Sequence, residues 1–461
     1  MAYTIDNAPL TWRHCYITAV ASLGQLIGTG LATLVSVIIP LYQIVSHPEL
    51  SSFMQGLVGA MDLIGIMVGS TILGKLSDKY GYLLFFRLCP AIVCVASIII
   101  LLFPHLWVLI VCLFFMGFGI GGEYSLDSNY VSQLMPTKWN FMMVGATKAA
   151  SALGNIGVAA ACFLIVKDWS NAHLWSHLLW LMIILSSLMI ILRIRWWESP
   201  KWLLNKGNLS QAEKDVHHFL GNDINVSQED IKASDNIASD ADELPHPQPQ
   251  PGFLRRNWKN VIFTGVPWAC EGLGVYGIGI FLPILVMALG LEHISPGATS
   301  IMHVDSSVKI TLWISCIILP GFILGLFLIN HVKPEKIQWW GFFLSAISLL
   351  VLLLAYEHHW AVWISIVSFM AFEMFLNMGP HLITFVLPPK VYPVADRGLG
   401  SGIAASLGKI GAVLGVFFIP ILLHSGGSSL VLIVSIIVMI VGGVVTFIFN
   451  PERGENVANN H

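Results

Sequence analysis

The chain has 461 residues, of which 56% are hydrophobic and only 11% charged, with a mean hydropathy of +0.76 and a formal net charge of −3. Soluble domains carry about 25% charged residues, so this composition excludes an ordinary water-soluble protein. The small net charge gives little information about partners, and no nucleic acid is expected among them. The chain is predicted to lie in a lipid bilayer.

Hydrophobic stretches recur along nearly the whole length, and each is long enough to cross a hydrocarbon core of about 30 Å. Helices are expected, because a helix satisfies its own backbone hydrogen-bonding groups in lipid. The spans are predicted at residues 15–42, 53–73, 83–103, 106–134, 141–166, 175–194, 260–289, 307–330, 337–355, 360–387, 399–423 and 429–449. The predicted fold class is therefore all-α integral membrane, with twelve transmembrane helices.

Two seven-residue segments are near copies of each other. Ser151-Ala-Leu-Gly-Asn-Ile-Gly157 recurs as Ala405-Ser-Leu-Gly-Lys-Ile-Gly411, and each follows a proline, Pro136 or Pro393, at a similar distance. We interpret the chain as one ancestral half written twice. Duplicated halves in so hydrophobic a chain are typical of a membrane transporter whose site lies between them.

The predicted organisation is two pseudo-symmetric six-helix halves, residues 1–195 and 258–450, joined by a cytoplasmic loop at 196–257 and followed by a cytoplasmic tail at 451–461. In the loop, residues 198–204 and 210–220 are expected to form short surface helices. Residues 222–251 are rich in Asp, Ser, Pro and Gln, and are predicted to be a disordered tether.

The basic residues predict the topology. If both termini are cytoplasmic, most Lys and Arg residues lie on the inner side, and only Lys167 and Lys309 fall outside. This asymmetry follows the positive-inside rule. The expected localisation is a multi-pass protein of the plasma membrane or the bacterial inner membrane.

Several kinds of chemistry have no support in the sequence. All seven cysteines lie in or beside spans, and no CxxC occurs, so neither disulfides nor a metal site is expected. There is no Walker loop, no nucleotide-binding glycine motif and no nucleophile–base constellation. We expect no cofactor and no enzymatic activity.

Ionisable residues inside spans are costly, so they are the first functional candidates. Glu123 follows the glycine-rich run 117–122 in span four and could exchange protons near neutral pH; the alternative is a structural carboxyl bonded to a neighbouring helix. Glu271 lies in a glycine-rich stretch of span seven that suggests a flexible or broken helix. Its alternative is an acid near the cytoplasmic boundary.

Lys409 occupies the place in span eleven that Asn155 holds in the first copy of the repeat. If one faces a shared cavity, both should. A positive charge there favours an anionic substrate or a partner carboxylate. Lys148 is expected to snorkel toward the cytoplasm. Interhelical hydrogen bonding is the expected role of three further acids, Asp62, Asp127 and Glu373.

Four segments together resemble a known superfamily. Gly74-Lys-Leu-Ser-Asp-Lys-Tyr-Gly81 resembles the signature loop of the major facilitator superfamily, and Glu198-Ser-Pro-Lys-Trp-Leu-Leu204 the sugar-porter signature after span six. Gly119-Ile-Gly-Gly-Glu-Tyr124 and the stretch from Phe385 to Ala412 resemble the phosphate:proton symporters and related organic-ion carriers.

The resemblance implies roles for particular residues. It places Asp78 and Gly81 in a cytoplasmic latch, and Glu198 and Arg397 in a charge network that holds the halves together. In the phosphate branch, the counterparts of five residues line the site: Glu123, Tyr124, Glu271, Tyr276 and Lys409.

Three departures count against phosphate. Gln25 stands where an acid is expected in span one, Gly154-Asn155 replaces the expected glutamine of span five, and the basic run expected after Gly81 reads Tyr-Leu-Leu. The carboxylates expected before Pro136 and Pro393 are Gln133 and Lys390. The proton route therefore cannot be copied from the family.

The prediction is a secondary transporter that moves a small polar, anionic metabolite, such as phosphate or an organic acid, by alternating access with proton coupling. Lys409 is the predicted anion contact, Tyr124, Asn155, Tyr276 and Gln25 are predicted to hydrogen-bond the substrate, and Trp268 to supply an apolar wall. Glu123 and Glu271 are the predicted proton-linked carboxyls. The expected partners are a small molecule, protons and the bilayer, and the chain is expected to be a monomer.

Rival functions remain open. A carrier of sugar or another neutral metabolite would use Gln25, Asn155 and the aromatic residues, and neutral-sugar competition would reveal it. A receptor derived from a carrier would bind without flux. A membrane enzyme is the most remote alternative.

Overall fold

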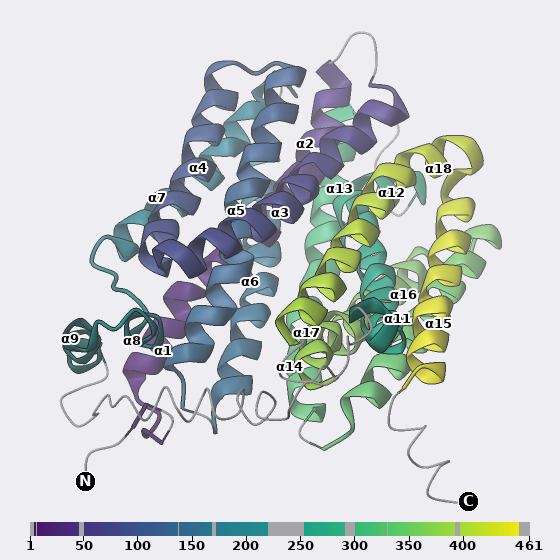
Figure 1. Ribbon diagram of the computed structural model, residues 1–461. Coiled ribbons are helices and arrows are strands. Elements are labelled where there is room, and N and C mark those ends of the chain that lie inside the picture. Colours follow the sequence, from purple (N-terminus) through teal and green to yellow (C-terminus); the bar gives the residue numbers. More distant parts are fainter. Residues whose placement is uncertain are drawn as a thin grey trace, which may run out of the picture. The chain divides into compact units, whose positions relative to one another are not determined.

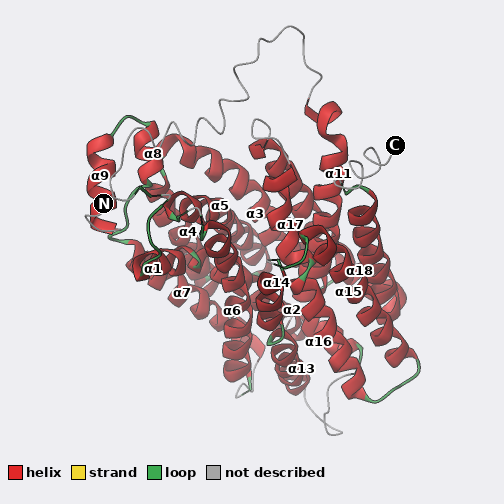
Figure 2. Cartoon of the chain, turned by 90° about the horizontal axis from the view of Figure 1, so that it is seen from below, coloured by secondary structure: helices red, strands yellow, loops and turns green. Residues whose placement is uncertain are grey.

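The computed structural model describes residues 4–5, 7–45, 50–136, 138–167, 172–219, 253–290, 300–329, 331–391 and 397–450, and these residues form helices without any strand (Figures 1 and 2). The N-terminal elements are α1 (Trp12–Ala21), α2 (Leu23–Val45), α3 (Ser52–Tyr80), α4 (Tyr82–Leu102), α5 (Leu106–Leu134), α6 (Asn140–Val166), η1 (Ala172–Leu178), α7 (Leu179–Arg193), α8 (Pro200–Asn205) and α9 (Leu209–Phe219). The remaining elements are α11 (Phe253–Gly272), η2 (Leu273–Ile278), α12 (Leu282–Ala288), α13 (Ser300–Ser315), α14 (Ile318–Leu328), α15 (Pro334–Glu357), α16 (Val362–Met378), α17 (Pro380–Val391) and α18 (Arg397–Ile448).

The predicted all-α membrane fold is confirmed. Among the described residues, eleven helical segments are long and apolar enough to cross a bilayer. The last of them, Ile403–Ile448, has 46 residues and contains Gly427 at φ 67° and ψ −170°, which lies outside helical geometry and divides it into two helices. Twelve spans result, as the hydropathy pattern predicts.

The two short helices expected after span six are also present, as α8 and α9. Ser199 caps α8 by accepting a hydrogen bond from the Trp202 N–H, and Pro200 occupies the first turn. Figure 2 shows α8 beside α9, and the two pack on each other. The predicted tether at 222–251 and the tail at 451–461 lie outside the described residues.

Several spans are interrupted where hydropathy predicts one continuous helix. Span one divides at Ser22 into α1 and α2, and span ten divides at Gly379, where Pro380 begins α17. Span seven contains η2, a π-helical stretch, followed by α12. Such stretches are frequent at functional sites, and this one follows Glu271 directly. The glycine-rich break expected there is therefore a change in helical pitch.

Exposed apolar side chains follow helical spacing on the outer surfaces. Trp107, Val111 and Phe115 form one such row on α5, and Ile184, Leu188 and Ile191 form another on α7. Apolar surfaces of this extent would be a liability in water. They are the expected boundary of helices that face lipid.

The chain forms two compact units, and each is described here by itself. The first contains Met1–Leu31, Ile64–Gly154 and Leu179–His246, and the second contains Ala32–Leu63, Asn155–Leu178 and Pro247–His461. These units follow spatial contacts rather than chain order. The predicted division into halves at residues 195 and 258 stays a prediction.

In the first unit, α4 packs between α5 and α7 (Figure 1). Its core contains aromatic rings in contact: Phe86 meets Tyr130 edge to face with centroids 4.9 Å apart, and Tyr130 and Trp196 are tilted with centroids 6.1 Å apart. Glycines let α3 approach α5 closely: a Cβ at Gly121 would collide with the Ile66 carbonyl. Small residues permit this backbone contact between membrane helices.

In the second unit, α11 packs along α18, and α15 packs against α16 and α18 (Figure 1). The α11–α18 contact is backbone to backbone, because a Cβ at Gly411 would collide with the carbonyl of Ala269. Gln338 of α15 donates a 3.0 Å hydrogen bond to the Thr446 hydroxyl of α18. The packing of α11 along α18 brings Lys409 of α18 to the side of α11.

Candidate functional site

The first unit holds a buried arginine between two acids, which we call the arginine cluster: Arg193, Glu123, Asp127 and Gln25. The Arg193 Nη1 atom lies 2.7 Å from Glu123 Oε2, and Nη2 lies 3.5 Å from Asp127 Oδ1. The side chains of Arg193 and Asp127 are fully buried, and that of Glu123 is 3% exposed. A buried ion pair forms only where the geometry compensates desolvation, so these charges are specifically placed.

Four helices hold Arg193 in place. It comes from the last turn of α7 and donates hydrogen bonds of 3.3 Å to the carbonyls of Phe86, Val20 and Ala21. Its guanidinium also lies 4.5 Å from the centroid of the Phe86 ring, a favourable cation–π distance. The arginine is therefore anchored on the helices rather than free to swing.

The α2 helix needs a residue without a side chain where it passes Glu123 and Asp127. A Cβ at Gly24 would lie 2.6 Å from Glu123 Cβ and would also collide with the Asp127 carboxylate. The next residue, Gln25, is buried, and its amide lies next to Asp127. The predicted substrate contact Gln25 is thus a neighbour of the acids.

Lys148 does not snorkel, which corrects the expectation from its position. Its side chain is buried, and its Nζ atom lies 5.2 Å from the centroid of the Tyr124 ring. Tyr124 itself is half-buried against Gly28 of α2. The structure therefore brings Gln25, Glu123 and Tyr124 together with the cations Lys148 and Arg193.

The second unit holds what we call the lysine cluster: Lys409, Tyr276, Trp268, Glu271, His381 and Asp62. The Lys409 Nζ atom donates to the Tyr276 hydroxyl at 3.2 Å and lies 4.5 Å from the centroid of its ring. Trp268 packs on Gly408 and meets Phe385 edge to face, with centroids 6.3 Å apart. The predicted contacts Lys409, Tyr276 and Trp268 therefore share one surface of α11, η2 and α18.

Asp62 of α3 is an acid within electrostatic reach of Lys409. The Asp62 side chain is completely buried, and the ammonium of Lys409 acts on it electrostatically. Its Oδ1 accepts the Leu63 N–H at 2.8 Å, whereas Oδ2 has no hydrogen-bond partner among the described residues. Close packing of Gly59 on Val416 of α18 positions this stretch of α3.

Glu271 forms a buried side-chain contact with His381, a residue that the sequence analysis did not single out. The His381 Nδ1 atom contacts Glu271 Oε1, and both side chains are nearly inaccessible. The ring of Phe322 lies 5.3 Å from that of His381. The break at Gly379–Pro380 gives α17 its own start, so His381 stands in the first turn, across from α11.

The repeat that predicts two halves has matching contacts. Gly154 packs on the carbonyl of Leu26 in α2, and Gly411 packs on the carbonyl of Ala269 in α11. A glycine of each copy therefore packs against the backbone of an earlier helix, α2 for the first copy and α11 for the second. Asn155 is half-buried, and its Oδ1 has no partner among the described residues. Whether Asn155 and Lys409 face one cavity stays a prediction.

Two of the four predicted latch residues meet. Glu198 accepts hydrogen bonds from the N–H groups of Tyr82 at 2.8 Å and Leu83 at 3.1 Å, so it caps α4. Gly81 precedes this turn at φ 95°, and a Cβ there would collide with the Glu198 carboxylate. Burial raises the pKa of the Glu198 carboxyl, opposed by the backbone N–H donors. The side chains of Asp78 and Arg397 lie outside the described part.

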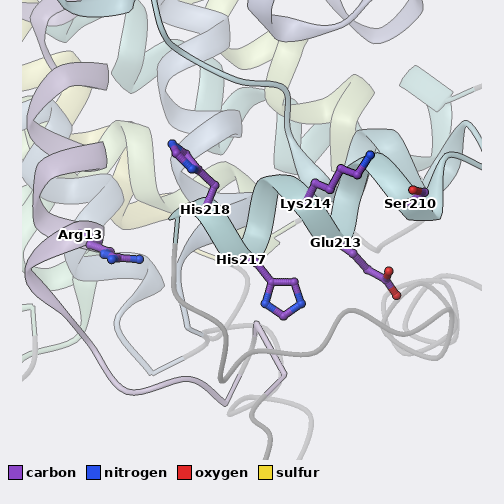
Figure 3. Close-up of a pocket in the computed structure, with 6 residues that line it drawn as sticks. All are labelled: Arg13, Ser210, Glu213, Lys214, His217 and His218. Atoms are coloured by element: carbon purple, nitrogen blue, oxygen red, sulfur yellow. The ribbon is translucent and has the colours of Figure 1, made fainter.

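A surface hollow of about 770 Å³ lies beside α9. Its lining residues are Arg13, Ser210, Glu213, Lys214, His217 and His218. Figure 3 shows Glu213 and His217 pointing to one side of the helix and Lys214 and His218 to the other. These side chains do not converge on a ligand. Among the described residues, no three potential ligand side chains gather to hold a metal.

Sequence reasoning missed Arg193 and His381. Arg193 ends a hydrophobic run and was counted among basic residues at the inner boundary, yet it is completely buried. The sequence held a signal for this role, because Arg193 is the only Lys or Arg in α7 and so the only cation of that helix that could pair with Glu123. His381 follows Gly379-Pro380, a helix-breaking pair in the middle of an apolar span, and this break is the available signal.

Helices long and apolar enough to cross a bilayer, with charged side chains buried among them, define an integral membrane protein. The xylose transporter XylE from E. coli, in a partially occluded inward open conformation, matches with a TM-score of 0.77 over 96% of this chain and 98% of that one, at 18% identity. A second structure, described as a D-xylose-proton symporter, has a TM-score of 0.74 at 17% identity, over 95% of this chain and 98% of that one. At such identities the likeness shows the fold alone, which is that of the major facilitator superfamily.

The sequence model of the sugar (and other) transporter family matches residues 12–455, and the chain belongs to this family. The inner membrane metabolite transport protein YgcS of Escherichia coli is 25% identical over 97% of this chain and 94% of its own length. The probable inorganic phosphate transporter 1-6 of Arabidopsis thaliana is 24% identical over 98% and 94%. The protein is an integral multi-pass membrane transporter of the major facilitator superfamily.

Proposed function

We propose that the protein moves a small anionic metabolite, such as phosphate or an organic acid, by proton-coupled alternating access. The observation that carries the proposal is the half-buried ammonium of Lys409, held over Tyr276 beside the apolar wall of Trp268. A cation at membrane depth is costly unless a carboxylate or a bound anion compensates it. A substrate anion would take this place during transport.

The buried acid Asp62 gives the lysine a second partner. When no substrate is bound, the Asp62 carboxylate balances Lys409; an arriving anion would compete with it for the ammonium. Substrate binding would therefore loosen the contact between α3 and α18. The relatives named as phosphate transporters support the anionic class, while Gln25 in place of the family's span-one acid supports a substrate other than phosphate.

A neutral sugar is the alternative substrate, because the two xylose-transporter structures share the fold. The lysine cluster argues for the anion, since a sugar offers no charge to compensate Lys409. If the substrate were a sugar, its hydroxyl groups would bind to Gln25, Asn155 and the aromatic residues. The proposed proton-linked sites are the arginine cluster that contains Glu123 and, in the second unit, Glu271. Both termini are proposed to be cytoplasmic.

The test is Lys409→Asn, which makes the two copies of the repeat alike. If Lys409 contacts an anion, binding of inorganic phosphate or a dicarboxylate should weaken by about 1.5–3 kcal/mol, the range for hydrogen bonds to charged groups. Thermal-shift titrations of the purified protein measure this, because a ligand that binds the native state raises its melting temperature. Equal weakening for anions and for neutral sugars would make Lys409 structural and remove the anion assignment.

The matched control is Lys148→Asn, which removes a buried cation from the ring of Tyr124 instead. An anion effect confined to Lys409 supports the lysine cluster as the substrate site. An anion effect confined to Lys148 would move the site to the first unit.

A further inference from the structure

The arginine cluster contains two acidic groups and one basic group. Two carboxyl groups, Glu123 and Asp127, face one guanidinium, and no side chain of the three exceeds 3% exposure. If both carboxyl groups were ionised, one buried negative charge would lack compensation, which is strongly unfavourable away from water. Two carboxyl groups that share a buried site avoid this cost by keeping one proton.

We propose that Glu123 and Asp127 hold one exchangeable proton between them, carried on Asp127, while Glu123 stays ionised against Arg193. The two carboxyl groups converge on one point of α2, because a Cβ at Gly24 would collide with Asp127 Oδ2 and would lie 2.8 Å from Glu123 Oε2. Each also has a buried oxygen without a hydrogen-bond partner among the described residues, Glu123 Oε1 and Asp127 Oδ2. A proton held between the carboxyl groups supplies the donor that they lack.

The distances decide which acid holds the proton. Arg193 is 2.7 Å from Glu123 and 3.5 Å from Asp127. The shorter contact has the length of a charge-assisted hydrogen bond, whereas the longer one is at the limit of hydrogen bonding. Asp127 is therefore the weaker partner of the guanidinium and the easier one to neutralise.

Among the described side chains, those that the other helices bring to α5 include no further cation in contact with Asp127. The α1 helix brings the buried His14, bonded to Thr11; α4 brings the Cys89 thiol; and α2 brings the Gln25 amide. From α6, Lys148 lies over the Tyr124 ring, and α8 brings the half-buried Lys201. On α3, the side chains of Lys75, Asp78 and Lys79 lie outside the described part. Arg193 is thus the described cation in direct contact with the pair.

The assignment deepens the proposed function and rests on it only for the use of the proton. Arg193 is anchored by three carbonyls and the Phe86 ring, so release of the proton from Asp127 leaves a surplus negative charge that the arginine cannot move to meet. Rearrangement of α5 against α2 and α7 would relieve this charge. Protonation would thereby be linked to the conformation of these helices.

The test needs no substrate. Purified protein is melted at several values between about pH 5 and pH 9, well above the unfolded Asp pKa of about 3.9. The folded wild type binds one more proton here than the unfolded chain, so its melting temperature should fall as the pH rises. Asp127→Asn mimics the protonated acid and keeps the Glu123–Arg193 pair; its melting temperature should depend less on pH and should exceed the wild-type value at the upper end.

Glu123→Gln separates the two acids. It also removes the surplus charge, but it leaves Arg193 with the distant carboxylate, so its melting temperature should lie below that of Asp127→Asn at every pH. Glu213→Gln, an exposed acid on α9, is the matched control and should follow the wild type. A pH dependence in Asp127→Asn equal to that of the wild type would overturn the proposal. So would a melting temperature of Asp127→Asn below that of Glu123→Gln, since Glu123 would then be the protonated acid.

A second measurement links the proton to transport. Accumulation of inorganic phosphate in proteoliposomes, driven by a pH gradient, should vanish in Asp127→Asn and persist in Glu213→Gln. Persistence in Asp127→Asn would overturn the coupling role. If the wild type carried no phosphate, the proposed substrate would fail while the melting curves would still decide the proton site.

Discussion

At the residue scale, the buried charges are arranged in compensated groups. Arg193 faces Glu123 and Asp127, Lys409 faces Tyr276 and lies within electrostatic reach of Asp62, and Glu271 faces His381. Sequence alone identified most of these residues as costly, because each stands inside an apolar run. It could not pair them, because the partners lie between about 65 and 350 positions apart and pairing depends on helix rotation.

The Glu271–His381 contact can be tested by a double-mutant cycle. Leaving a buried donor or acceptor without its partner costs about 1–3 kcal/mol, and more where the group is charged. Glu271→Gln and His381→Gln should each destabilise the protein strongly, while the double variant should lose much less than the sum. The measurement is the free energy of unfolding in detergent.

The control for that cycle pairs Glu271→Gln with Glu335→Gln on α15, a second buried acid of the same unit. Additive losses, within about 0.5 kcal/mol, are expected for two acids that do not bond to each other. Additive losses for Glu271 and His381 as well would contradict a direct interaction between them.

At the element scale, hydropathy located the spans and missed their interruptions. A window of apolar residues cannot distinguish one helix from two that meet at Ser22 or Gly379, because lipid exposure looks the same on both sides of the break. The π-helical stretch after Glu271 depends on how Gly277 approaches Gly415 of α18. The latch turn was recognised from its motif, and its geometry explains why a glycine stands there.

Gly81→Ala tests that turn. Gly81 adopts φ 95° and ψ 165°, a region open essentially to glycine, and a Cβ would also enter the Glu198 carboxylate. Gly207 adopts φ 77° with nothing within 4 Å of a Cβ. Gly207→Ala should therefore cost about 1–2 kcal/mol from backbone strain alone, and Gly81→Ala should cost more, as measured by thermal unfolding. Equal costs would show that Glu198 moves away freely.

The pH dependence of the same turn has a defined sign. Burial raises the pKa of Glu198 above its ordinary 4.5, so the folded state binds the proton more tightly than the unfolded chain. This contribution to stability is present below the unfolded pKa and is lost as the pH rises through the folded pKa. Glu198→Gln should flatten this part of the melting profile, from about pH 4.5 upward. If the melting temperature of Glu198→Gln fell with pH as steeply as that of the wild type, the pH dependence would belong to other acids.

At the scale of the whole molecule, the duplicated segment was the most informative pattern in the sequence. Its two copies have matching contacts, since Gly154 lies against α2 and Gly411 against α11. What the repeat could not predict is the difference between its copies, because Asn155 and Lys409 occupy like places with unlike neighbours. The chemistry of the site resides in that difference, since Lys409 acquires Tyr276 and Asp62.

The orientation of the whole chain rests on its basic residues and gives the widest prediction. With both termini cytoplasmic, Ser210 on α9 lies inside and Ser425, just before the non-helical Gly427, lies outside. Both side chains are exposed. Single cysteines at these two positions, in a background with the exposed Cys15 and Cys316 replaced, should react with an impermeant maleimide from opposite sides of sealed vesicles. Inside-out vesicles should label Ser210→Cys and intact cells Ser425→Cys, because an odd number of spans separates the two. Labelling of both from one face would require an even number of crossings between α9 and Gly427, and the twelve-span arrangement with its central cytoplasmic loop would have to be abandoned.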